Sequence, residues 1–259
     1  MIDAHVHIWR PGRNGCIWPT EEDGVLHRDF SLDDYPGTRA VLVQSQESTL
    51  DSEWLLDVAA NDDRVAAVVG WADLTAPEWI AERPKLAGLR PMVQQREADW
   101  YDDPALEAGL RTMLDHGLRL DALLRVRHLP SLARLAVRFP ALPIVIDHAA
   151  KPEIEGGFEA WREAIAPLAA LPNVMCKLSG LLTECGDAPA GAVAPYAGEI
   201  LALFEPERVM WGSDWPVVNA VSSYGEWLAQ ARALVPAAAH AAVFGGTAAR
   251  FYGIEGPAA

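Results

Sequence analysis

Apolar and polar residues follow two alternating patterns along this chain. Short, nearly continuous apolar runs, such as Ala-Val-Leu-Val at 40–43 and Pro-Ile-Val-Ile at 143–146, are separated by segments whose apolar residues return every three or four positions. The first pattern is typical of parallel strands that are covered on both faces, and the second is typical of amphipathic helices. The chain is therefore predicted to alternate strands with helices.

The expected strands end where each apolar run gives way to polar or aromatic residues. They are Ile2–Ile8, Ala40–Gln46, Val65–Trp71, Gly88–Val93, Arg119–Val126, Leu142–Asp147, Val174–Ser179 and Arg208–Asp214. The expected helices are Asp51–Asn61, Ala76–Arg83, Pro104–His116, Leu129–Phe139, Phe158–Ala170, Pro195–Phe204, Tyr224–Leu234 and Ala237–Tyr252. Eight strands alternating with eight helices predict a (β/α)8 TIM barrel, a single domain over residues 1–259. A doubly wound open sheet is the alternative, but no Gly-x-Gly-x-x-Gly follows the first strand.

Charge and composition exclude several classes of partner. A formal net charge of −15 at pH 7 opposes binding to nucleic acid or to an anionic membrane surface. No apolar run approaches the roughly 20 residues that span a bilayer, and no basic and apolar leader precedes the first strand. Cys16, Cys176 and Cys185 lack Cys-x-x-Cys spacing, which argues against a disulfide framework. We expect a cytoplasmic protein, monomeric or homo-oligomeric, that acts on a small molecule.

Two histidines stand two positions apart in the first predicted strand. Side chains of a strand alternate between its faces, so His5 and His7 point the same way. Both imidazoles could then reach one metal ion or one substrate atom. A polar edge strand is the plainer interpretation of the pair.

Other residues at strand ends strengthen the interpretation as a site. The active site of a TIM barrel gathers at the C-terminal ends of its strands, where strand eight lies beside strand one. Asp214 should therefore lie near His5 and His7, with His148 approaching from the opposite side of the mouth. Such a set can hold one divalent metal and lower the pKa of its water. Without a metal, the aspartate could act as general base while the histidines bind a carbonyl oxygen. The plainer alternatives are a helix N-cap for Asp214 and a packed core histidine for His148.

Further polar and aromatic residues near the strand ends are candidates for holding a substrate. They are Arg90, Gln46, Glu47, Trp18, Trp71 and Trp215. The arginine would meet a carbonyl or carboxylate, or else a structural ion-pair partner. The glutamine and glutamate suit sugar hydroxyls, and the tryptophans offer flat faces to a sugar ring. The roles of Lys177, Lys151 and His128 stay open.

Taken together, these motifs resemble a known family. The segments that carry the resemblance are Asp-Ala-His-Val-His at 3–7, Asp-His-Ala-Ala-Lys-Pro at 147–152, Lys-Leu-Ser-Gly at 177–180 and Trp-Gly-Ser-Asp-Trp-Pro at 211–216. They are similar to the amidohydrolase superfamily, and more narrowly to its amidohydrolase-related sugar lactonase branch, which is L-fuconolactonase- and L-rhamnonolactonase-like. The resemblance covers the whole chain. Trp18-Pro19 and Arg28-Asp29-Phe30 are similar to the sugar-lactone members in particular.

The resemblance implies a distorted barrel that opens the ring of a sugar-derived lactone, such as L-fuconolactone. It implies that Asp214 activates the water and returns the proton to the leaving alkoxide, while His148 and its neighbours polarise the carbonyl. The cofactor is expected to be none, or one divalent metal such as zinc on His5, His7, His148 and Asp214. Arg90 on strand four argues against a second metal. The alternatives are a metal-dependent decarboxylase, a dicarboxylate-lactone hydrolase and an inactive sugar-binding barrel.

Overall fold

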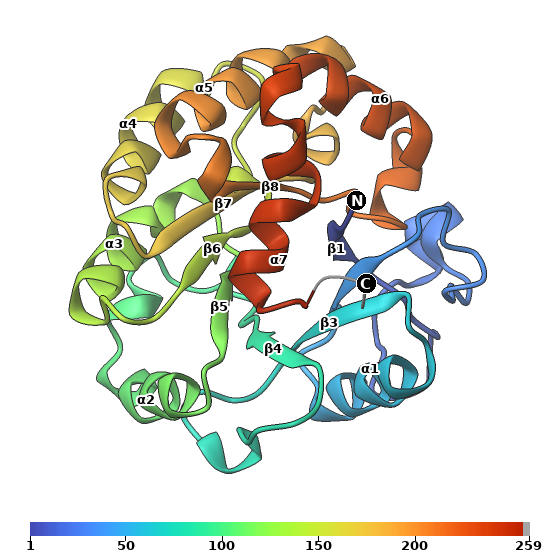
Figure 1. The fold of residues 1–259 in the computed structure, drawn as a ribbon, viewed down its shortest axis with the longest axis vertical. Coiled ribbons are helices and arrows are strands. Elements are labelled where there is room, and N and C mark those ends of the chain that lie inside the picture. Colours follow the sequence, from blue (N-terminus) through green and yellow to red (C-terminus); the bar gives the residue numbers. More distant parts are fainter. Residues whose placement is uncertain (256–259) are drawn as a thin grey trace.

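Eight parallel strands lie side by side in chain order in the computed structural model of this chain, which describes residues 1–255 (Figure 1). The strands are β1 (Asp3–Val6), β2 (Ala40–Val43), β3 (Val65–Gly70), β4 (Leu86–Leu89), β5 (Arg119–Ala122), β6 (Ile144–Ile146), β7 (Val174–Leu178) and β8 (Val209–Trp211). After β8, the backbone N–H of Asp214 donates to the carbonyl of His5, and that of His7 donates to Trp215, at 3.0 and 2.7 Å. These bonds bring the last strand back to the first. The predicted TIM barrel is confirmed.

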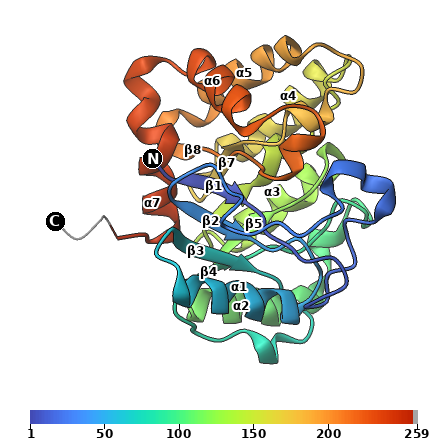
Figure 2. The same ribbon diagram turned by 90° about the vertical axis from the view of Figure 1, so that its right-hand side faces the viewer.

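Helices cover the outside of the strands (Figures 1 and 2). They are α1 (Thr49–Asn61), α2 (Glu107–Asp115), α3 (Leu129–Arg138), α4 (Phe158–Ala169), α5 (Ala194–Phe204), α6 (Tyr224–Leu234) and α7 (Thr247–Tyr252). The short helix α7 instead lies across the N-terminal end of the barrel, and the long loop after β1 lies at the opposite end (Figure 2). Helix α7 thus lies at one end of the barrel, and the loop after β1 borders the end at which the strands finish.

Small aliphatic side chains fill the interior of the barrel toward its N-terminal end. Val41, Val43 and Val69 form part of an interior cluster that Phe251 and Tyr252 of α7 complete at the N-terminal end of the barrel. A second, larger cluster fills the space between the strands and the outer helices. Alternate positions of each strand therefore serve the two layers, as the near-continuous apolar runs predict. Among the described residues, no helix has the length and apolar character needed to cross a membrane.

Two predicted helices are wrong or only partly right. The segment Ala76–Arg83 contains only the 3₁₀ turn Pro77–Trp79. Prolines at both ends leave too few residues to offset the cost of helix nucleation, and Pro84 disfavours the helical conformation at the residue before it. The helix predicted over Ala237–Tyr252 is interrupted at Gly245, whose φ is 156°. A Cβ at Gly245 would lie 3.0 Å from the backbone nitrogen of Ile2, so the backbone just before β1 passes directly over this glycine.

Every predicted strand also extends further toward the mouth than the strand in the structure does. The first, expected over Ile2–Ile8, ends at Val6. The polar residues at the strand ends leave the hydrogen-bonded ladder and line the mouth instead.

Candidate active site

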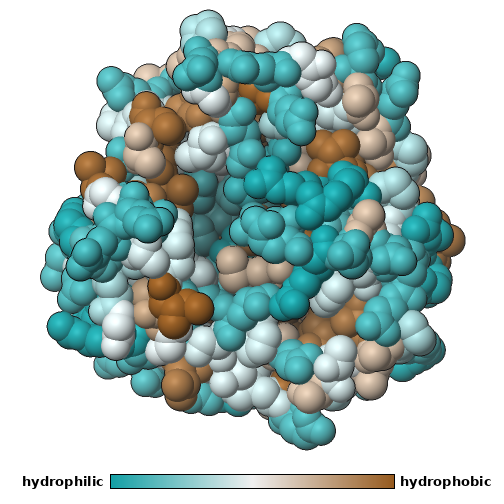
Figure 3. All heavy atoms as spheres, turned by 180° about the vertical axis from the view of Figure 1, so that it is seen from behind, coloured by the Kyte–Doolittle hydropathy of each residue, from teal (hydrophilic) through white to brown (hydrophobic). Residues whose placement is uncertain are grey.

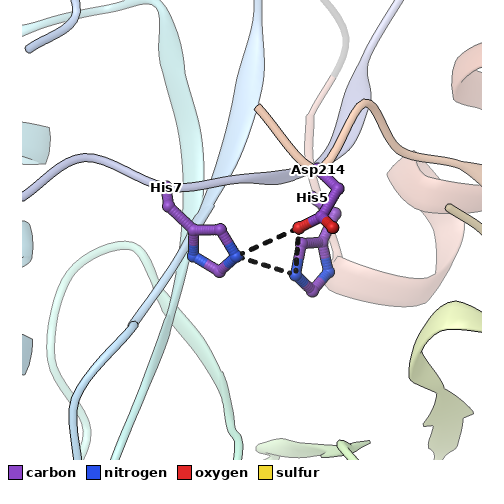
Figure 4. A group of neighbouring side chains, drawn as sticks. All are labelled: His5, His7 and Asp214. Carbon is purple, nitrogen blue, oxygen red and sulfur yellow. Dashed lines mark hydrogen bonds and ion pairs between the residues drawn. The ribbon is translucent and has the colours of Figure 1, made fainter. Parts of the chain in front are cut away.

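Four side chains predicted to act together converge at the C-terminal end of the barrel. The Nε2 atoms of His5 and His7 lie 3.2 Å apart. Oδ1 of Asp214 lies 3.8 Å from the first and 3.4 Å from the second (Figure 4). His148 places its Nε2 3.9 Å from the same oxygen. All four side chains are buried, and the surface at this end is hollowed near its centre, with mainly hydrophilic residues around the hollow (Figure 3).

A β-bulge in β1 sets the direction of the two histidines. Asp3 pairs with Ala40 and Val6 pairs with Leu42, so β1 carries one residue more than β2 between these positions. The Asp3 carboxylate holds the bulge, because its Oδ1 accepts the backbone N–H groups of His5 and Ser213 at 3.2 and 2.8 Å. Burial raises the pKa of Asp3 to about 6, against the opposing effect of these hydrogen bonds. The sequence motif predicts the histidine pair but not the bulge beneath it.

His148 reaches the site from a left-handed turn. Four successive residues, from His148 to Lys151, have φ between 50° and 67°. Residues other than glycine rarely adopt this conformation, and a run of them persists only where the surroundings enforce it. The turn directs Nδ1 of His148 to the hydroxyl of Ser179 at 2.8 Å and leaves Nε2 facing Asp214.

Two glycines make room for the histidines. A Cβ on Gly180, whose φ is 61°, would lie 2.6 Å from Cγ of His148 and still closer to its Nδ1. A Cβ on Gly212 would lie 2.6 Å from Cβ of His5. The sequence shows both glycines only as parts of motifs, whereas the structure assigns each a steric reason.

The charge states of the central groups follow from their surroundings. Burial raises the pKa of Asp214, but His148, His7 and His5 outweigh burial and hold that pKa well below its usual range. Burial lowers the pKa of His148 to about 4, and the attraction of Asp214 only partly offsets this. Burial and the nearby Lys177 likewise hold the pKa of His5 well below its ordinary value. At neutral pH an ionised carboxylate therefore faces neutral imidazoles of His5 and His148.

A buried ionic cluster forms the floor of the site. We call it the barrel-floor network, and it consists of Lys177, Asp121, Asp147 and Tyr252. Nζ of Lys177 lies 2.5 Å from Oδ2 of Asp121, 2.9 Å from Oδ1 of Asp147 and 3.1 Å from Nδ1 of His5. The hydroxyl of Tyr252 donates to Asp121 at 2.6 Å. Sequence reasoning missed Asp121 as a site residue, although a charged residue inside an apolar strand was the available signal.

Arg90 lies at the edge of this network. Its Nη1 is 3.5 Å from Oδ2 of Asp147, and its Nη2 donates to the carbonyl of Gln44. The Gln44 amide donates in return to the Arg90 carbonyl at 2.7 Å. The ion pair is therefore present, while Nε of Arg90 faces no partner among residues 1–255.

Gln46 and Glu47 serve the loops around the mouth. The amide oxygen of Gln46 accepts the backbone N–H groups of Ile17 and Trp18 at 3.0 and 3.3 Å, and its nitrogen donates to the carbonyl of Trp18. Glu47 is exposed and pairs with Arg96 at 3.0 Å. The structure thus uses Gln46 to fix the first loop rather than leaving its amide open to a ligand.

The three candidate tryptophans have different surroundings. Trp18 is partly exposed beside the mouth and packs edge-on against Trp9, with ring centroids 5.2 Å apart. Trp71 is also partly exposed. Trp215 is only 3% exposed, and its ring packs against those of Phe30 and Tyr35. This placement does not support the predicted substrate contact by Trp215, because core neighbours cover its ring.

Two residues of open role also find partners. Lys151 pairs with Glu184 at 2.9 Å at the rim of the mouth, where Arg125 also approaches Glu184 at 3.8 Å. His128 is buried, and its two ring nitrogens contact the backbone of Arg125 and of Arg96. His128 therefore joins the loops after β4 and β5 and does not enter the site.

The donor atoms of His5, His7 and Asp214 have spacings that suit one metal ion. A tetrahedral zinc ion with ligands at 2.0–2.1 Å requires donor atoms roughly 3.3 Å apart. The three spacings here are 3.2, 3.4 and 3.8 Å. Nδ1 of His7 also donates to the carbonyl of Val43 at 2.7 Å, the kind of outer partner that orients a metal-binding histidine. These residues could hold zinc, with His148 next to them.

A cavity on the opposite end of the barrel does not mark the site. A cavity of about 1480 Å³ opens at the N-terminal end of the barrel, where Arg39, Arg119 and Tyr252 contribute to its lining. The group formed by His5, His7 and Asp214 lies instead at the mouth, as does a second possible metal-binding group formed by His5, Asp147 and His148. The chemistry of the side chains therefore locates the site.

Known proteins resemble this chain over nearly its whole length. The sequence profile of the family described as Amidohydrolase matches residues 2–254. An L-fucono-1,5-lactonase from Burkholderia ambifaria is 45% identical, over 99% of this chain and 96% of that protein. An L-fucono-1,5-lactonase from Burkholderia multivorans is 37% identical, over 99% and 97%. A crystal structure of an amidohydrolase from Burkholderia multivorans with bound zinc superposes with a TM-score of 0.89, at 34% identity, over 98% of this chain and 99% of that one.

Proposed function

This chain belongs to the amidohydrolase family, and we propose that it hydrolyses a sugar-derived lactone of the aldonolactone class, such as L-fucono-1,5-lactone. The observation that carries the proposal is the ionised Asp214 facing three imidazoles at the mouth of the barrel. The 45% identity to an L-fucono-1,5-lactonase, over nearly the full length of both chains, supports the substrate class.

Asp214 is proposed as the general base. A water molecule beside its Oδ1 loses a proton to the carboxylate as the oxygen attacks the lactone carbonyl carbon. Protonation does not compete at neutral pH, because the neighbouring histidines hold the pKa of Asp214 well below its usual range. When the ring C–O bond breaks, the protonated Asp214 returns the proton to the leaving alkoxide, and the product is the open-chain acid.

The histidines are proposed to stabilise charge on the carbonyl oxygen. His5 and His148 place their Nε2 atoms within 4 Å of Oδ1 of Asp214, close to where the substrate carbonyl would lie beside the attacking water. Fixed donors that face a developing oxyanion are among the strongest contributors to acyl-transfer catalysis. When bound at His5, His7 and Asp214, zinc would lower the pKa of water and polarise the carbonyl.

Charge pairing around the mouth favours a neutral substrate. Arg96 pairs with Glu47 at 3.0 Å, Lys151 pairs with Glu184 at 2.9 Å, and Arg90 faces Asp147. A dicarboxylate lactone would need cations that are not already matched, and the net charge of −15 opposes its approach. The dicarboxylate-lactone and decarboxylase alternatives are accordingly not favoured.

The proposal also covers the cofactor and the compartment. We propose at most one metal ion, with zinc as the candidate, because β4 supplies Arg90 at the mouth rather than a further ligand. A cytoplasmic location suits the three cysteines, which are free and buried.

A lactone panel tests the proposed function. L-fucono-1,5-lactone, related aldonolactones and 2-pyrone-4,6-dicarboxylate are assayed with a pH indicator, with and without a chelator. Each rate is corrected for spontaneous hydrolysis. We expect turnover of one or more neutral sugar lactones and none of the dicarboxylate. Turnover of the dicarboxylate alone, or of no lactone at all, would overturn the proposal.

A further inference from the structure

We infer that Lys177 is a positioning residue that holds His5 as its Nε2–H tautomer. In this tautomer His5 acts as a hydrogen-bond donor to the substrate carbonyl rather than as a ligand of a metal ion. The donor role rests on the proposed function, whereas the tautomer follows from contacts within the protein. Lys177 is fully buried and lies beneath the site on β7.

The contacts of Nζ determine which nitrogen of His5 carries the proton. Nζ pairs with the carboxylates of Asp121 and Asp147, and its third close neighbour is Nδ1 of His5 at 3.1 Å. A lysine ammonium has three donors and no acceptor. An N–H on Nδ1 would point at another N–H, so Nδ1 must accept and the proton of the neutral ring lies on Nε2.

The next contacts agree with this assignment. His7 lies with Nδ1 2.7 Å from the carbonyl oxygen of Val43, which can only accept, so this nitrogen carries the proton of His7. In a neutral ring Nε2 of His7 is then an acceptor, and it lies 3.2 Å from Nε2 of His5. One continuous series of hydrogen bonds runs from the Lys177 ammonium through His5 and His7 to the carbonyl of Val43, and each group donates to the next. A lactone carbonyl oxygen would take the place of Nε2 of His7 as acceptor.

The same contacts set a cost on metal binding. A histidine binds a metal through an unprotonated nitrogen. His7 already presents one, but His5 would have to move its proton to Nδ1, against Lys177. The alternative partner for that proton is Oδ1 of Asp147, which lies 3.5 Å away. The spacing of the donor atoms suits zinc, while Lys177 opposes the tautomer that zinc needs.

The barrel-floor network keeps Lys177 in place. The positive charge of Lys177 is paired with the carboxylates of Asp121 and Asp147. Arg90 supplies a second positive charge beside Asp147, so two cations face two carboxylates. Tyr252 supports Asp121 from α7, on the side away from the mouth. A single substitution of Lys177 would leave two carboxylates with one cation, so the informative variant removes one charge of each sign.

The first experiment uses the unaltered protein. Metal-free protein with ¹⁵N-labelled histidine is studied by two-bond ¹H–¹⁵N correlation NMR, which distinguishes protonated from unprotonated ring nitrogens. The His5 signals are assigned by comparison with His5→Gln. We expect Nε2 of His5 to be protonated and Nδ1 to be unprotonated. The opposite pattern would overturn the inference without any assay of activity.

The second experiment compares variants. The charge-neutral double variant Lys177→Met/Asp121→Asn should move the proton of His5 to Nδ1 and tighten zinc binding by about 10- to 100-fold, the range typical of partners behind a metal ligand. Tyr252→Phe is the matched control, because it alters the same network without contacting His5, and it should change neither property. Zinc affinity is measured by competition with a chromophoric chelator.

The outcomes separate this inference from the proposed function. An unchanged zinc affinity and tautomer in the folded double variant would overturn the role of Lys177, even if the wild-type protein hydrolyses sugar lactones. The expected tautomer and affinity changes would support that role even if the lactone panel failed. If the double variant does not fold, the NMR experiment on the wild-type protein still decides the tautomer.

Discussion

The space beside Gly180 provides a sharp test of how His148 is positioned. In Gly180→Ala, the new Cβ would lie 2.6 Å from Cγ of His148 and 3.0 Å from its Cβ. Carbon atoms that are not bonded to each other normally stay about 3.5–4.0 Å apart, so the imidazole must move by roughly 1 Å. The hydrogen bond between Nδ1 of His148 and the hydroxyl of Ser179 would be lost in that movement.

The expected effect has two components. The φ of 61° at Gly180 is unfavourable for alanine and costs about 1–2 kcal/mol. That cost acts on stability alone and, at this chain length, lowers Tm by about 2–4 °C per kcal/mol. A displacement of about 1 Å at a reacting group lowers activity by about 100-fold. The variant should therefore be folded, slightly destabilised and strongly impaired in kcat/KM for a sugar lactone.

Gly117→Ala is the matched control. Its φ is 63°, no heavy atom would lie within 4 Å of its Cβ, and it lies between α2 and β5, away from the site. Both variants carry the same backbone cost, and only the first carries the clash. Lactone hydrolysis is followed with a pH indicator, and Tm by circular dichroism. The reasoning is refuted if both variants lose activity equally, or if Gly180→Ala keeps wild-type kcat/KM.

Two further predictions follow from buried ionisable groups. Burial lowers the pKa of His148 to about 4, so its imidazole should remain neutral in the folded protein as the pH falls through 6.5. The unfolded chain takes up a proton at this histidine near pH 6.5, so the folded protein should lose stability between pH 6.5 and 4. Histidine NMR signals assigned with His148→Asn test this, and a midpoint near 6.5 would contradict it. Asp3→Ala should cost about 2–5 kcal/mol in urea unfolding, because it leaves the buried N–H groups of His5 and Ser213 without their acceptor. Asp3→Asn keeps an acceptor and should lower the free energy of unfolding by less. Equal stabilities of Asp3→Ala and wild type would refute the role of Asp3 in holding the bulge.

The parts of the site that could be predicted from sequence are those carried by simple periodicity. His5 and His7 share a face because strand side chains alternate, and Asp214 joins them because the last strand of a barrel lies beside the first. Both arguments need only residue spacing and chain order. The same arguments locate the mouth and therefore His148.

The remaining features depend on information that spacing does not contain. Lys177 and Asp121 lie on strands that are not neighbours in sequence, and only the closed barrel shows that both side chains point inward to one another. The ring of Trp215 packs against Phe30 from the first loop, a contact that no local pattern encodes. The prediction of a helix at 76–83 is wrong for a local reason: its prolines prevent the helix that the amphipathic pattern indicates.

Replacing Asp214 by asparagine removes the proposed general base of the lactone hydrolase and leaves the rest of the site in place. The variant keeps the shape of the side chain, and asparagine tolerates the φ of 57° at this position, so the fold should be preserved. Loss of a general base lowers kcat by about 10²- to 10⁴-fold. The measurement is kcat for L-fucono-1,5-lactone, with folding checked by circular dichroism. We expect a loss in that range, and a folded Asp214→Asn variant with kcat within about tenfold of wild type would rule out Asp214 as the general base.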